Sequence, residues 1–396
     1  MFRALWPPSV LAAPPPRFTL PKYSGPRLRP ARTPFPIPAI LLYNAAMPIT
    51  LTALADLAAL GFDTIIDVRS PSEWADDHVP GAISLPVLDD AERARVGTIY
   101  KQVSPFTARK LGAALVARNA AAHLEGPLAD MAGGWRPLVY CWRGGQRSAS
   151  FATILSQIGW RVETLAGGYK AYRALVVRAM YDTPFPARVI LLDGNTGSGK
   201  TALLPRLAAL GVQVIDLEGL ARHRGSLFGG MAGGQPSQRA FEGALAMATV
   251  ALDPASPVVV EAESAKIGNL RLPPALWKAM QAAPRIEIAA SPATRVAHLV
   301  QAYPDMVADR ARLDAILVAL KPLHPAEVIA AWRAHAATGD FAAMAEGLIG
   351  HHYDPRYDRH RARSAPPVAT VDADSLDDAG LDRLAGHVAG AIRIVA

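Results

Sequence analysis

Residues 188–201 read Arg188-Val189-Ile190-Leu191-Leu192-Asp193-Gly194-Asn195-Thr196-Gly197-Ser198-Gly199-Lys200-Thr201. An apolar run ends at a glycine-rich loop of the pattern G-x-x-x-x-G-K-T, and a helix-like stretch over 202–210 follows. This order predicts a buried strand, a phosphate-binding loop (P-loop) and a helix, whose N-terminus and backbone N–H groups attract phosphate oxygens. We therefore expect Gly194 to Thr201 to bind a phosphate or diphosphate. Lys200 adds a full positive charge, and Thr201 is placed to reach a Mg²⁺ ion.

Two further strands are expected in this half of the chain, over residues 212–216 and 258–263. A nucleotide hydrolase normally places an aspartate after the second of these strands, where it holds Mg²⁺ and orients water. Here the acids are Glu261 and Glu263, with Asp216 as a further candidate. The sequence leaves open whether the P-loop hydrolyses a nucleotide or only grips a diphosphate.

The only cysteine of the chain stands in the segment Leu138-Val139-Tyr140-Cys141-Trp142-Arg143-Gly144-Gly145-Gln146-Arg147-Ser148. An apolar run ends at the thiol, and a short Arg/Gly loop precedes a helix-like stretch over 148–158. Inward-pointing backbone N–H groups, the helix N-terminus and two guanidinium groups all favour thiolate over thiol. We expect a reactive Cys141 with a lowered pKa, and we name Cys141, Arg143 and Arg147 as candidate catalytic residues.

The residues around Cys141 alternate between strand and helix patterns. A helix is expected over 52–60, and buried strands over 63–69, 138–140 and 162–165. Such alternation predicts a parallel sheet covered by helices. Reactive groups gather at the carboxyl ends of the strands in these sheets, which is where Cys141 falls.

Four pieces of this half match one family in order: Asp67-Val68-Arg69, Glu73-Trp74, His78-Val79-Pro80-Gly81-Ala82 and the Cys141 loop. Together they resemble the rhodanese family, in which the loop cysteine carries a transferable sulfur or selenium. We expect the set Asp67, Arg69, Glu73 and His78 to be structural, because buried polar side chains need hydrogen-bond partners.

The length of the Cys141 loop supports a competing interpretation. Five residues separate Cys141 from Arg147, which is the spacing of cysteine-dependent phosphatases, where the thiolate attacks phosphorus and the arginine holds the phosphate oxygens. Ordinary rhodanese loops are one residue shorter, so this loop has room for a phosphate-like or selenophosphate-like group. The phosphatase interpretation also requires a general acid, which the sequence does not place.

The charge of the chain is concentrated at its beginning. The net charge is +7, but residues 1–46 hold six basic residues, eleven prolines and no acid, so the other 350 residues carry only +1. A nucleic-acid surface on the folded part must therefore be a local patch. The sequence contains no stretch of about 20 uninterrupted apolar residues, so no membrane span is expected. A single cysteine excludes an internal disulfide, which suits a cytoplasmic protein.

We expect four regions along the chain. Residues 1–46 are predicted to be a disordered proline-rich leader, and Met47 opens the first patterned segment, which suggests an over-extended gene start. Residues 47–180 are expected to form a rhodanese-like α/β domain with a parallel sheet. Residues 184–365 are expected to form a P-loop NTPase-like α/β domain, also with a parallel sheet. Residues 366–396 are expected to be an appendage with one helix over 376–392.

Two basic stretches are candidates for binding nucleic acid. Residues 217–226 followed by the glycine-rich run 229–234 predict a mobile basic loop near the phosphate site, with Arg222 and Arg224 as contacts. Residues 351–363 interleave tyrosines with basic groups. In such a segment the basic side chains can contact a phosphate backbone and the tyrosine rings can stack on unpaired bases. Its candidates are Tyr353, Arg356, Tyr357 and Arg359. The histidine pair at 351–352 lacks a supporting acid or cysteine framework, so no metal site is expected.

A rhodanese domain joined to a P-loop domain resembles the tRNA 2-selenouridine synthase family over residues 47–359. The specific pieces are the Cys141 loop, the P-loop, Leu217-Glu218-Gly219-Leu220-Ala221-Arg222-His223-Arg224-Gly225-Ser226, Val260-Glu261-Ala262-Glu263-Ser264-Ala265-Lys266-Ile267-Gly268 and Tyr353-Asp354-Pro355-Arg356-Tyr357.

This resemblance implies replacement of sulfur by selenium at C2 of the wobble 2-thiouridine of certain tRNAs. It implies selenophosphate as the selenium donor, geranyl diphosphate as the donor for S-geranylation of the same base, and the tRNA anticodon loop and a selenophosphate supplier as partners. No tightly bound cofactor is implied. A nucleotide-driven tRNA sulfurtransferase and a phosphatase-like regulator remain open as alternatives.

Overall fold

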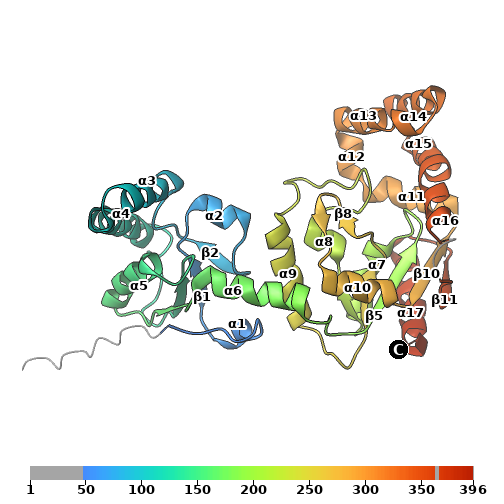
Figure 1. Ribbon diagram of the computed structural model, residues 1–396. Helices are drawn as coiled ribbons and strands as arrows, with labels where there is room; N and C mark the ends of the chain where they lie inside the picture. Colours follow the sequence, from blue (N-terminus) through green and yellow to red (C-terminus); the bar gives the residue numbers. More distant parts are fainter. Residues whose placement is uncertain (1–47, 362–364, 396) are drawn as a thin grey trace, which may run out of the picture. The chain divides into compact units, whose positions relative to one another are not determined.

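Strand β5 (Val189–Gly194), which leads into the P-loop, is buried along its whole length. The structure is a computed structural model that describes residues 48–361 and 365–395 (Figure 1). In it β5 is the middle of a five-stranded sheet of order β11-β10-β5-β7-β6, whose neighbouring strands all pair in parallel. The other strands are β6 (Gln213–Ile215), β7 (Val258–Glu261), β10 (Arg285–Ala290) and β11 (Ala369–Ala373).

Helices cover this sheet because its strands are apolar on both faces. The covering helices are α7 (Lys200–Ala209), α8 (Leu217–Ala221), α9 (Gln238–Val250), α10 (Pro274–Ala282) and α17 (Asp378–Val395). One core cluster joins Ile190 of β5 to Leu203 of α7 and Val388 of α17. A short antiparallel hairpin, β8 (Lys266–Ile267) and β9 (Leu270–Arg271), follows β7.

The end of the chain differs from the expected appendage. Strand β11 pairs with β10 from Ile286↔Ala369 to Ala290↔Ala373, so it is the edge strand of the P-loop sheet. Helix α17 packs against α7 and buries Leu384 and Val388. The expectation failed because a five-residue edge strand beside two prolines carries little apolar periodicity of its own.

After β10 the chain forms a group of helices in which α14 packs against both α13 and α15 (Figure 1). The group consists of α11 (Pro292–Ala302), α12 (Pro304–Ala308), α13 (Arg310–Ala319), α14 (Ala326–Thr338), α15 (Phe341–Leu348) and α16 (Asp354–Arg361). A π-helix, Ile349–Tyr353, connects α15 to α16. π-Helices are rare and frequently occur at functional sites, because the extra residue in the turn redirects side chains.

The first half of the chain forms a four-stranded parallel sheet of order β2-β1-β3-β4. Its strands are β1 (Thr64–Asp67), β2 (Ala82–Ser84), β3 (Pro137–Tyr140) and β4 (Glu163–Thr164). Its helices are α1 (Asp56–Ala59), α2 (Pro71–Asp76), α3 (Asp90–Gln102), α4 (Pro105–Glu125), α5 (Gln146–Ile158) and α6 (Gly168–Val177). The two predicted parallel α/β sheets are therefore confirmed.

The helix expected over 52–60 is shorter than predicted. The Asp56 carboxylate accepts hydrogen bonds from the backbone N–H groups of Thr52 (2.7 Å) and Ala53 (2.9 Å). Aspartate side chains that bond nearby backbone groups compete with helix formation, so only Asp56–Ala59 is helical.

The predicted leader over 1–46 and the predicted basic position Arg363 lie outside the described residues. Among the helices that are described, none combines the length and the apolar character needed to cross a membrane. Within 48–361 and 365–395, no three His, Cys, Asp or Glu side chains are grouped so that they could hold a metal ion.

Candidate functional site

Cys141 directly follows strand β3 and is only 3 % exposed. The loop after it turns sharply at Gly144, where φ is +65° and a Cβ atom would lie 2.5 Å from the Leu165 carbonyl oxygen. The Tyr169 backbone N–H donates to the Cys141 carbonyl at 2.9 Å. Glycine is required at this turn because it has no Cβ and tolerates positive φ. The loop is therefore held against the start of α6.

Hydrogen-bond donors surround the Cys141 sulfur. The Ser148 hydroxyl and the Gly145 backbone N–H each lie 3.2 Å from Sγ. Burial raises the pKa of the thiol, but hydrogen bonds from Ser148 and from the Arg143 backbone, with the charge of Arg147, lower it overall below its usual value. The loop therefore places donors around the sulfur as the prediction requires.

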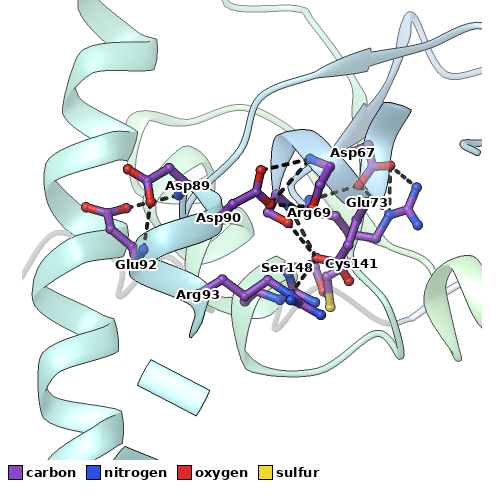
Figure 2. Close-up of polar contacts among 12 residues, drawn as sticks. Asp67, Arg69, Glu73, Asp89, Asp90, Glu92, Arg93, Cys141 and Ser148 are labelled. Atoms are coloured by element: carbon purple, nitrogen blue, oxygen red, sulfur yellow. Dashed lines mark hydrogen bonds and ion pairs between the residues drawn. The ribbon is translucent and has the colours of Figure 1, made fainter. Parts of the chain in front are cut away.

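The two loop arginines have different positions. Arg147 donates from Nη1 to the Glu73 carboxylate of α2 at 2.8 Å, and Arg93 of α3 pairs with the same carboxylate at 3.0 Å. Arg143 is exposed. Its backbone N–H, and not its side chain, lowers the pKa of the Cys141 thiol. Figure 2 shows the Arg93 side chain extending towards Ser148 and Cys141, with Glu73 beside them.

Asp67 and Arg69 behave as structural residues, as predicted. Arg69 is 1 % exposed and its Nη2 lies 2.6 Å from the Asp67 carboxylate (Figure 2). The same nitrogen donates to the Asp77 carbonyl. His78 stacks on Trp74 with ring centroids 3.6 Å apart. These contacts hold the segment that carries Glu73, and Glu73 in turn holds Arg147.

The P-loop forms the floor of a cleft of about 480 Å³. Lys200 donates from Nζ to the Gly194 carbonyl at 2.7 Å. Ser198 Oγ is buried and has no hydrogen-bond partner among the described residues, so it is available to a bound anion. Burial lowers the pKa of Lys200, but nearby negative charges, including Glu263 and Glu218, raise it overall. Lys200 is thus a stable cation facing the cleft.

The carboxylates near the P-loop differ from those expected. Asp216 caps α8 by accepting the Gly219 N–H at 2.6 Å, so it is used structurally. Glu218, which we had not singled out, accepts the Thr201 hydroxyl at 2.7 Å and lines the cleft. Burial and the charge of Glu218 raise the pKa of Glu261 to about 8 and that of Glu263 to about 7. Only the one-turn helix α8 brings Glu218 here, and sequence spacing gave no signal of it.

The helical group is tied to the P-loop by a partly buried ion pair that we also had not predicted. Arg295 of α11 donates two hydrogen bonds to the Asp354 carboxylate of α16, at 2.9 and 2.7 Å. Asp354 also accepts from Asn195 of the P-loop at 2.9 Å. Because Arg295 and Asp354 are 59 positions apart in the sequence, no local motif marks the pair.

The residues predicted to bind tRNA occupy two kinds of position. Arg222 and Arg359 are exposed, as a nucleic-acid contact requires. Arg224 lines the phosphate cleft and pairs with Asp305 at 2.9 Å. Tyr353 packs against the apolar core of the helical group and lines the cleft. Arg224 therefore lies at the phosphate site, near which its loop was expected, whereas Tyr353 faces this site and was expected on a surface for bases.

Arg356 and Tyr357 also line the cleft. Arg356 donates from Nη1 to His352 Nε2 at 2.9 Å, and His352 Nδ1 lies 2.8 Å from His324 Nε2. Because a guanidinium can only donate hydrogen bonds, Nε2 of His352 is the acceptor from Arg356. The proton of His352 is therefore on Nδ1, and this N–H donates a hydrogen bond to Nε2 of His324. Burial and the charge of Arg356 lower the pKa of His352 to about 4. The neutral histidine pair orients Arg356, a role that the sequence did not indicate.

An apolar cavity adjoins the phosphate cleft. It is lined by Leu299, Val300, Met306, Leu313, Met344 and Ile349. Five residues line both spaces: Thr196, Ser226, Leu299, Tyr303 and Tyr353. The phosphate site thus has an anion-binding floor, and an apolar cavity shares part of its wall.

The fold and the two sites define a class of protein with a cysteine-loop α/β domain followed by a phosphate-binding α/β domain. Comparison with protein families gives the same division. A rhodanese-like domain matches residues 50–175, and a tRNA 2-selenouridine synthase AAA domain matches residues 187–315.

The chain belongs to the tRNA 2-selenouridine synthase family. A tRNA 2-selenouridine synthase of Pseudomonas fluorescens is 33% identical over 339 residues, which cover 78% of this chain and 92% of that protein. Those of Hahella chejuensis and Nitrosomonas europaea are 38% identical over 251 and 254 residues. The matches span 63% and 66% of these two relatives, and 60% and 63% of this chain.

Proposed function

We propose that this protein replaces sulfur by selenium at C2 of the wobble 2-thiouridine in tRNA. In this proposal selenophosphate is the selenium donor, and the base is first S-geranylated from geranyl diphosphate so that its sulfur becomes a better leaving group. The relatives named tRNA 2-selenouridine synthase support the tRNA substrate and the selenium chemistry.

One observation carries the geranyl step: the phosphate cleft and an apolar cavity share five lining residues. A diphosphate joined to a prenyl chain matches this pairing, with the diphosphate on the P-loop and the chain against Leu299 and Met306. Lys200 and the P-loop backbone would stabilise the diphosphate as it leaves. The walls of this cavity, which include leucine, valine and methionine side chains, suit a hydrocarbon chain.

The Cys141 loop supports the selenium step. A buried sulfur surrounded by N–H and O–H donors, with a positive charge at Arg147, suits an anionic donor or a covalently held selenium. Because the chain has one cysteine, selenium held on Cys141 has no second thiol in the same chain to receive it. Direct delivery to the tRNA base is therefore the proposed route.

The test uses the full-length protein with an anticodon stem-loop that contains 2-thiouridine. Mass spectrometry of the nucleosides should show the geranylated base with geranyl diphosphate alone, and the selenouridine once selenophosphate is added. ATP hydrolysis without the prenyl donor, and no geranyl transfer, would instead favour a nucleotide-driven sulfurtransferase. Release of phosphate from an aryl phosphate, lost in Cys141→Ser, would favour the phosphatase alternative.

A further inference from the structure

A second large cavity, of about 820 Å³, opens beside the phosphate cleft. Four residues line both spaces: Gly225, Glu263, Arg356 and Tyr357. The apolar cavity shares none of these four residues. The phosphate cleft therefore has two different neighbours, and Glu263 stands at the boundary with the larger one.

The lining of this second cavity is aromatic and polar. Trp277 of α10 is half-buried in its wall, and Tyr357 of α16 lies at its boundary with the cleft. Arg285 and Arg361 add positive charge and are held in place by Asp193 and Glu287, at 3.4 and 2.7 Å. Flat aromatic rings with fixed guanidinium groups bind an unstacked nucleobase and its phosphates.

Glu263 occupies the position where the two spaces meet. A Cβ on Gly225, whose φ is +64°, would lie 2.6 Å from Glu263 Oε1 and 2.8 Å from Glu218 Oε1. The loop after α8 therefore closes over these carboxylates only because residue 225 is glycine. The charged groups that act on Glu263 are Glu218 of α8, Glu261 of β7 and Lys200 of α7.

We propose that the second cavity receives the acceptor nucleobase of the RNA, stacked on Trp277, and that Glu263 removes the proton that the base loses. The proposal rests on the proposed function, and it names the acceptor site and the general base of the geranyl step. The arrangement places the prenyl chain and the base on different sides of the diphosphate, with the reacting atoms at their boundary.

The step balances without any further reactant. The sulfur of 2-thiouridine attacks C1 of the geranyl group, so the S–C1 bond forms and the C1–O bond to the diphosphate breaks. The bonding pair leaves with the diphosphate beside Lys200. The N3 proton of the base passes to the Glu263 carboxylate, which leaves a neutral S-alkylated base. A carboxyl group that titrates near neutral pH suits this role, and burial raises the pKa of Glu263 to about 7.

Steady-state geranyl transfer to the 2-thiouridine stem-loop tests the proposal in the full-length protein. Trp277→Ala is expected to raise KM for the RNA by about 10-fold or more, since one base stack is typically worth that much. Its Kd for geranyl diphosphate, measured by calorimetry, should be unchanged. Trp277→Phe, which keeps an aromatic ring, should recover most of the RNA affinity.

Glu263→Gln is expected to lower kcat by roughly 10²-fold or more. We expect the rate of the wild type to rise through about pH 7, and Glu263→Gln to abolish this rise and leave KM for the RNA unchanged. The exposed Glu327→Gln on α14 is the matched control and should behave as wild type. Circular dichroism of each variant checks that it is folded.

Two results overturn the inference separately from the proposed function. If the wild type transfers the geranyl group but Trp277→Ala keeps the wild-type KM for RNA, the base does not enter this cavity. If Glu263→Gln keeps the wild-type kcat and pH profile, Glu263 is not the base. Failure of the wild type to transfer the group at all would instead refute the proposed function.

Discussion

The Ser148 hydroxyl donates to the Cys141 sulfur at 3.2 Å. Burial alone would raise the pKa of this thiol. The hydrogen bonds from Ser148 lower the pKa more than the charge of Arg147 does. A side chain in the first turn of α5 therefore has a larger effect on the thiolate than either loop arginine that the sequence singled out.

Ser148→Ala is expected to raise the pKa of Cys141, because a hydrogen bond that stabilises the thiolate is lost. The pH dependence of alkylation by iodoacetamide measures this directly, since no other cysteine reacts. Ser156→Ala, at the far end of the same helix, is the control and should leave the profile unchanged. An unchanged profile for Ser148→Ala would show that the hydroxyl does not stabilise the thiolate.

Asp354→Ala should destabilise the P-loop domain by roughly 3–5 kcal/mol, because it leaves the buried Arg295 guanidinium without its partner. Urea denaturation measures the loss. Asp378→Ala breaks the exposed Arg206–Asp378 pair and should cost about 1 kcal/mol or less. Equal losses in the two variants would contradict the buried tie between the helical group and the P-loop.

Glu261 makes the free energy of unfolding depend on pH. Burial raises its folded pKa to about 8, so the folded state binds one proton more than the unfolded state between about pH 4.5 and 8. Stability from this group is present below the unfolded pKa and is lost as pH rises to about 8. Glu261→Gln should flatten the fall in unfolding free energy between about pH 4.5 and 8. A fall as steep as that of the wild type would refute this assignment.

Binding of tRNA should weaken markedly as salt rises, because local basic groups supply the affinity. A filter-binding titration of the stem-loop against salt gives the slope. Arg359→Ala should reduce that slope by about one, and the exposed Arg118→Ala on α4 should leave it unchanged. A flat salt dependence in the wild type would contradict a phosphate-contacting patch.

The sequence predicted the parts of the structure that depend on local pattern. Both parallel sheets, the P-loop and the thiolate-stabilising Cys141 loop follow from short stretches in which strand, glycine loop and helix are contiguous. It failed where distant segments meet. Glu218 lies within what looked like a basic loop, Asp216 serves as a helix cap, and Arg295 finds Asp354 across most of the helical group. Tyr353 looked like a surface aromatic, but the π-helix turns it towards the cleft.

The most direct test of the central claim, that one chain alkylates a tRNA base at the P-loop and delivers selenium at Cys141, compares two variants. Mass spectrometry of wobble nucleosides is applied to cells that lack the gene and carry wild type, Lys200→Ala or Cys141→Ser. We predict selenouridine with the wild type only, no geranylated base with Lys200→Ala, and accumulated geranylated base with Cys141→Ser. Selenouridine that persists in the deletion strain, or geranylation that survives Lys200→Ala, would contradict the account.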